Sequence, residues 1–147
     1  MSVSSGVPRP AFWLGLAGLI PFASLALVLW LAPAWRDWAS PMLTGYGVVI
    51  LSFMGGCRWG LAAAGMGDSA RLKPLAMSVV PALYAWLIAL LPDADAQVLL
   101  AIGVLALLTA DLMLARNGGA PPWWPALRWP LSIGASGSLF AGAMALA

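Results

Sequence analysis

Five long apolar runs, separated by short breaks, constrain the fold of this 147-residue chain more than any other feature. A run of about 17–25 apolar residues is long enough to cross a bilayer as an α-helix. The sequence therefore predicts an all-α integral membrane protein, a bundle of about five transmembrane helices. The expected helices cover residues 11–33, 42–65, 74–92, 96–115 and 127–147.

The composition agrees with a membrane location. Hydrophobic residues make up 63% of the chain and charged residues 8%, whereas a soluble domain averages about 25% charged residues. The breaks are too short for a folded soluble unit, so we expect residues 1–147 to form a single transmembrane helical domain. The net charge of +2 is too small to indicate nucleic-acid binding.

The residue types narrow the chemistry. The chain has no histidine, and its five acidic residues are all aspartates, so the commonest general acid–base and metal-binding groups are missing. Cys57 is the single cysteine, which excludes an internal disulfide and a cysteine-based metal site. We therefore expect a protein that is not an enzyme, with no catalytic residues, no metal and no cofactor.

The distribution of charge predicts the orientation of the helices. With five spans, the N-terminus and the second and fourth breaks share one side of the membrane. That side holds the basic residues Arg9, Arg71, Lys73, Arg116 and Arg128. The opposite side holds one basic residue, Arg36. Because basic loops stay in the cytoplasm, we expect a cytoplasmic N-terminus and a C-terminus on the opposite side, which in a bacterial inner membrane is the periplasm.

Two ionisable side chains, Arg58 and Asp111, lie inside the predicted spans. Arg58 follows Met42 by about 24 Å of helix, and Asp111 follows Ala96 by about 22 Å, at ~1.5 Å per residue. Since these two helices run in the same direction, both charges are expected at one depth. An unpaired charge at the centre of a bilayer costs about 2.5–3.5 kcal/mol on insertion scales, so pairing across the bundle is favoured.

Three interpretations of this pair remain open. In the first, the two residues form a structural ion pair that sets the register of two helices. In the second, each side chain reaches separately toward the inner interface. In the third, they form a functional polar site. A proton relay is disfavoured because arginine keeps its proton at ordinary pH.

Small residues recur every four positions in the second predicted helix, at Ser52, Gly56, Gly60 and Ala64. Such a pattern lets another helix approach closely. Arg58 lies about 200° around the helix from Gly56, on a different face. We expect the small residues to pack within the monomer, with a homodimer interface as the alternative.

Aromatic side chains inside the spans provide a candidate cavity lining. These residues are Tyr46, Trp59, Tyr84 and Trp86. Together they would suit a flat hydrophobic molecule, whereas simple packing is the other interpretation.

The stretch "GYGVVILSFMGGCRWGLA" (45–62) resembles the signature of a bacterial domain-of-unknown-function family related to the mitochondrial transmembrane protein 69. The matching positions are Tyr46, Gly47, Ser52, Phe53, Gly55, Gly56, Arg58, Trp59 and Gly60. "GLAGLIPF" (15–22) and "SVVPALYAWL" (78–87) are also similar to that family. The resemblance implies a small multi-helix inner-membrane protein and supplies no mechanism.

These observations lead to one functional expectation and two alternatives. We expect a non-catalytic accessory, assembly or scaffold subunit that contacts the lipid bilayer and another inner-membrane protein or complex. The first alternative is a small transporter or channel that uses Arg58 and Asp111. The second is a binder of a hydrophobic ligand such as a quinone or tetrapyrrole.

Overall fold

The computed structural model describes residues 6–65 and 72–147, and all of its regular structure is helical. Five α-helices and one short 3₁₀ helix, η1, occur in these residues. Their bounds are α1 Arg9–Leu31, η1 Pro33–Trp35, α2 Arg36–Ala64, α3 Leu72–Ile88, α4 Asp93–Arg116 and α5 Trp124–Leu146. The predicted all-α bundle of five helices is confirmed.

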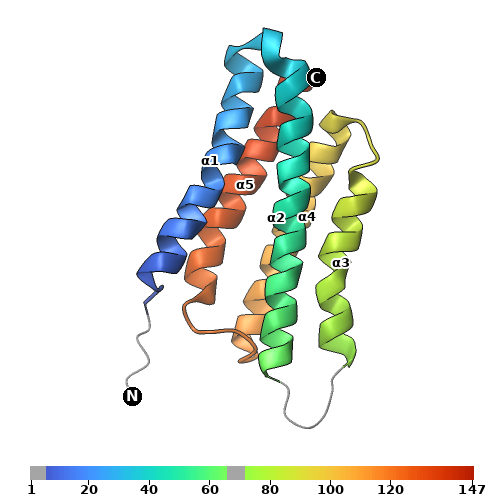
Figure 1. The fold of residues 1–147 in the computed structure, drawn as a ribbon. Helices are drawn as coiled ribbons and strands as arrows, with labels where there is room; N and C mark the ends of the chain where they lie inside the picture. Colours follow the sequence, from blue (N-terminus) through green and yellow to red (C-terminus); the bar gives the residue numbers. More distant parts are fainter. Residues whose placement is uncertain (1–5, 66–71) are drawn as a thin grey trace.

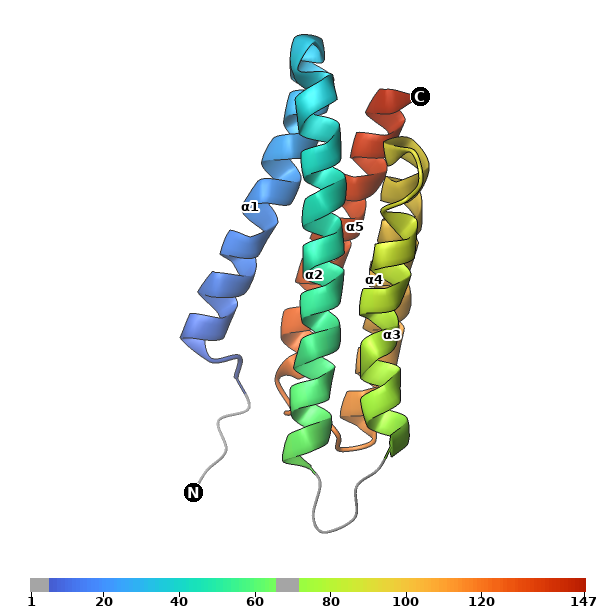
Figure 2. The same cartoon turned by 45° about the vertical axis from the view of Figure 1, so that its right-hand side comes forward.

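The helices run alternately up and down, so that the start of α1 and the end of α5 lie at opposite ends of the bundle (Figures 1 and 2). α2 and α4 run in the same direction, which brings their charged residues to comparable depths. α2 contacts each of the other four helices, and part of its surface stays exposed. Of the basic residues used to predict the orientation, Arg71 lies outside the described residues.

Two helix boundaries differ from the predicted ones by four residues or more. α2 begins at Arg36 because Pro41, which we expected to precede the helix, is accommodated inside it. α3 ends at Ile88, where two short turns replace the helical ladder: the N–H of Leu90 bonds to the carbonyl of Leu87, and that of Leu91 to Ile88. The residue before a proline is disfavoured in helical geometry, and Pro92 follows directly.

Four helices of the described chain are long and apolar enough to cross a membrane; α3, with 17 residues, is the shorter exception. Large apolar side chains fill the middle of the bundle. Those with almost no solvent exposure are Phe22, Leu29, Leu43, Leu51, Leu100 and Leu139. These residues come from α1, α2, α4 and α5, so all four of these helices share one core.

α2 and α3 pack closely at Gly55. An ideal Cβ at this position would lie 2.6 Å from the backbone carbonyl oxygen of Ser78. The small-residue face that we predicted lies one position further on. Gly56, Gly60 and Ala64 are exposed, and no atom of another described helix lies within 4 Å of a Cβ built at Gly56 or Gly60.

The prediction that these small residues pack within the monomer is therefore wrong for Gly56, Gly60 and Ala64, whereas Ser52 is half-buried. The physical reason is the rotation of α2 about its own axis. This rotation is set by the packing of Gly55 against α3 and by the bond of Arg58 to Asp111 in the bundle interior. The homodimer alternative stays a prediction.

Two substitutions at neighbouring positions test this rotation of α2. Gly55→Ala should lower the free energy of unfolding by about 1–3 kcal/mol, because a backbone atom blocks the added methyl group. Gly56→Ala should stay within about 1 kcal/mol of the wild type. Thermal unfolding in detergent measures the stability of both variants, with the reactivity of the half-buried Cys57 as the reporter of unfolding. Equal stability of the two variants would contradict the packing.

Candidate functional site

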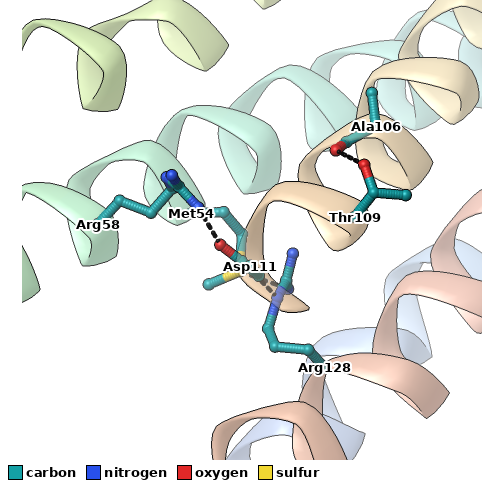
Figure 3. A network of polar contacts seen from close by, with 6 residues as sticks. All are labelled: Met54, Arg58, Ala106, Thr109, Asp111 and Arg128. Atoms are coloured by element: carbon teal, nitrogen blue, oxygen red, sulfur yellow. Dashed lines mark hydrogen bonds and ion pairs between the residues drawn. The ribbon is translucent and has the colours of Figure 1, made fainter. Parts of the chain in front are cut away.

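Asp111 lies between two arginines in the interior of the bundle (Figure 3). Nη1 of Arg58 donates to Oδ1 of Asp111 at 2.6 Å, and Nε of Arg128 donates to Oδ2 at 2.7 Å. The predicted pair of Arg58 and Asp111 is confirmed. Arg128, which we had placed in a cytoplasmic break, completes a three-residue ion cluster.

The ion cluster joins three helices, because Arg58 belongs to α2, Asp111 to α4 and Arg128 to α5. The side chains of Asp111 and Arg128 are 1% and 5% exposed, and that of Arg58 is 16% exposed. Burial removes water from all three groups, so each charge depends on its partners. The cluster therefore fixes the register of α2, α4 and α5.

The charges of the ion cluster do not balance. Within the described residues, Asp111 is the one carboxylate in salt-bridge distance of either arginine, which leaves an excess of one positive charge. Nη1 of Arg128 contacts the Met54 sulfur, a weak acceptor, and Nη2 has no hydrogen-bond partner in the described chain. The site is thus poor in acceptors and would favour an added anion.

The prediction for Arg128 was wrong because the start of the last helix was placed too late. α5 begins at Trp124 with Pro125 in its first turn, a position where proline is favoured. Arg128 therefore lies one turn inside the helix. Ser132 and Ser136 follow at four-residue intervals and are buried on the same face. Proline placement together with this polar spacing was the available signal.

The four aromatic residues do not line one common cavity, which was one of the two interpretations given for them. The Tyr46 hydroxyl donates to the Gly18 carbonyl at 2.9 Å, which ties α2 to α1. Trp59 and Trp86 are 48% and 60% exposed and lie on the outer surface, because their positions on α2 and α3 turn away from the core. Tyr84 lines a groove between α2, α3 and α4, and its hydroxyl donates to the Leu99 carbonyl at 2.7 Å.

Cavities adjoin the ion cluster on two sides. An apolar groove of about 350 Å³ lies between α2, α3 and α4, and a more polar pocket of about 410 Å³ lies at the end of these helices; Arg58 lines both. A smaller cavity of about 130 Å³ beside α1, α2 and α5 is lined by Arg128 and Ser132. No set of three or more candidate metal ligands occurs in the described residues.

A second polar network lies at the other end of α2 and α4. The hydroxyls of Ser40 and Thr44 each donate to a carboxylate oxygen of Asp93 at 2.8 Å. The buried Gln97 amide lies 3.3 Å from both hydroxyl oxygens. Asp93 thus connects the start of α4 to α2.

Removing this carboxylate should destabilise the end of the bundle where α2 and α4 begin. Asp93→Ala leaves two buried hydroxyls without their acceptor and should lower the free energy of unfolding by about 1–3 kcal/mol. Asp95→Ala, an exposed position in the same helical turn, should change it by less than about 0.5 kcal/mol. Thermal unfolding measures both, and an unaffected Asp93→Ala variant would show that the network adds no stability.

The helices and the enclosed ion cluster define a multi-pass helical membrane protein. Four of its described helices meet the length and hydropathy of membrane spans. The chain belongs to the family described as "Protein of unknown function (DUF3429)", whose model matches residues 7–144. This membership confirms the resemblance to a family of unknown function.

The chain is also similar to two animal proteins called transmembrane protein 69. It is 41% identical over 138 residues to the protein of Xenopus tropicalis, covering 90% of this chain and 53% of the relative. It is 34% identical over 127 residues to the protein of Mus musculus, covering 82% and 50%. The chain thus spans about half the length of these curated relatives. No solved structure matches it.

Proposed function

We propose that this membrane protein is a non-catalytic accessory subunit that docks on another membrane protein through the outer face of α2. The observation that carries the proposal is the exposure of Gly56, Gly60 and Ala64 with no described neighbour at the two glycines. In lipid, helices associate mainly by close packing, for which small residues are the usual contact. An exposed stripe of this kind is suited to a partner helix.

The interior contacts of α2 support this role. Gly55 packs against the backbone of α3, and Arg58 bonds to Asp111 on α4. Both contacts fix the rotation of α2 about its own axis. The outer face is therefore held in one orientation before a partner binds, which lowers the entropy lost on docking.

Transport through the ion cluster is less well supported. Arg58 and Asp111 lie near one end of α2 and α4, and the Asp93 network lies near the other. Between them, Leu51, Leu100 and Leu139 have almost no exposure. An ion path would need free polar groups or water across this layer. The three leucines offer none, and the buried Ser136 hydroxyl already donates to the Ala101 carbonyl.

The proposed location is the bacterial inner membrane, with the N-terminus in the cytoplasm. Arg9, Lys73 and Arg116 lie at one end of the helices, whereas Asp37 and Asp93 lie at the other. Basic groups favour the cytoplasmic side. A reporter that is active only in the periplasm, fused after Ala147, should be active; activity of the same reporter at the N-terminus would reverse the orientation.

Site-specific photo-crosslinking in cells tests the docking face. A photoreactive residue at position 60 should capture one membrane partner, and the same probe at the exposed Ala17 of α1 should not. Gly56→Leu should abolish the crosslink, whereas Ala17→Leu should leave it intact. A crosslink between two copies of this chain would make the face a homodimer interface. Equal labelling from both positions would contradict the proposal.

A further inference from the structure

The excess positive charge of the ion cluster lies next to an apolar groove that opens between helices. The groove between α2, α3 and α4 is lined by apolar side chains such as Val80, Ile102 and Leu107, with Arg58 at one position. Val80 and Ile102 are exposed, so the groove opens toward the side of the bundle that lipid would contact. Its volume of about 350 Å³ lies within the ~300–1,000 Å³ range of small-molecule sites.

The polar pocket meets this groove at Arg58. It lies where α2 ends and α3 begins, and Asn117 and Gly119 from the connection between α4 and α5 also line it. Arg58 uses Nη1 for Asp111. A guanidinium has five N–H donors in all, so donors remain for a second acceptor. A headgroup in the polar pocket and a tail in the groove would both reach this one side chain.

Charge selects the headgroup. Arg58 and Arg128 share the single carboxylate of Asp111, which leaves one positive charge without a counter-ion in the described residues. A guanidinium binds phosphate oxygens through paired charge-assisted hydrogen bonds. A zwitterionic headgroup brings its own cation beside the arginine, so it would neutralise the excess charge less well than an anionic one.

We infer that the chain binds one anionic phospholipid, with its phosphate on Arg58 and an acyl chain in the groove between α2, α3 and α4. The site is independent of the docking face, because Arg58 and Gly56 lie on different sides of α2. Loss of lipid binding would therefore leave the partner crosslink intact, and the reverse also holds. The two proposals can fail separately.

Native mass spectrometry of the detergent-purified full chain tests the site. The probes are phosphatidylglycerol and phosphatidylcholine with identical acyl chains. The wild type should retain phosphatidylglycerol at least about tenfold more strongly, the equivalent of about 1.4 kcal/mol. Arg58→Gln should remove this preference. Its ion cluster becomes neutral, with Asp111 still bonded to Arg128, so the variant should remain folded.

A second variant tests the groove without touching the ion cluster. Ala106 is exposed and lines the groove, so Ala106→Phe should fill it and weaken both lipids at least about tenfold. Ala17→Phe, on an exposed part of α1 outside the groove, is the matched control and should bind as the wild type does. Equal retention of the two lipids by the wild type would overturn the proposal. So would full displacement of lipid by inorganic phosphate, or binding that Ala106→Phe leaves unchanged.

Discussion

Asp111→Asn is expected to lower the free energy of unfolding by about 3–5 kcal/mol, the typical cost of removing one partner from a buried ion pair. The substitution keeps the size of the side chain and removes its charge. Arg58 and Arg128 would then be two buried cations with one neutral carbonyl between them. The effect should exceed that of any other single change in the ion cluster, because Asp111 alone contacts both arginines.

Thermal unfolding in a neutral detergent measures this loss, with the reactivity of Cys57 as the reporter of unfolding. Asp37→Asn, at an exposed position at the start of α2, is the matched control. It should change the free energy by less than about 0.5 kcal/mol. A loss below about 1 kcal/mol for Asp111→Asn would mean that water reaches the carboxylate and screens its charge.

Exchanging the charges of Arg58 and Asp111 should fail to restore stability, which is the second large effect. For an isolated ion pair, Arg58→Asp combined with Asp111→Arg keeps one charge of each sign in contact. Here the arginine introduced at position 111 would face Arg128, 2.7 Å from the present carboxylate. Like charges repel strongly in a low-dielectric interior.

The double variant is therefore expected to remain at least about 3 kcal/mol less stable than the wild type. Adding Arg128→Asp inverts the whole ion cluster and should regain part of the loss. Fluorescence-monitored size-exclusion chromatography and thermal unfolding would follow all three variants. Full recovery in the double variant would show that Arg128 is not a member of the cluster.

The sequence was informative about the fold because transmembrane helices follow from the length of apolar runs. All five helices were predicted, with boundary errors where proline occurs. Pro41 was treated as a break although α2 continues through it, and Pro125 was not used as the start of α5. Proline is compatible with the first turn of a helix and ends or bends it further along, so its position decides its effect.

The candidate site could be predicted in part. Arg58 and Asp111 were paired from depth alone, because two helices that run in the same direction place equal spacings at equal heights. The depth of a residue along its helix does not reveal how the helix is rotated about its own axis. That rotation depends on contacts such as Gly55 against the Ser78 carbonyl, which are properties of the packed bundle. The errors at Gly56, Trp59 and Trp86 have this origin.

Double-mutant cycles test the central claim, that Asp111 bridges two arginines. The cycles combine Asp111→Asn with Arg128→Gln, and separately with Arg58→Gln, and compare the free energies of unfolding. Contacting residues show interaction energies of about 0.5–3 kcal/mol. The structure predicts interaction energies of at least about 1 kcal/mol in both cycles. An interaction energy near zero between Arg128 and Asp111, with a clear value for Arg58 and Asp111, would contradict the ion cluster and return Arg128 to the membrane surface.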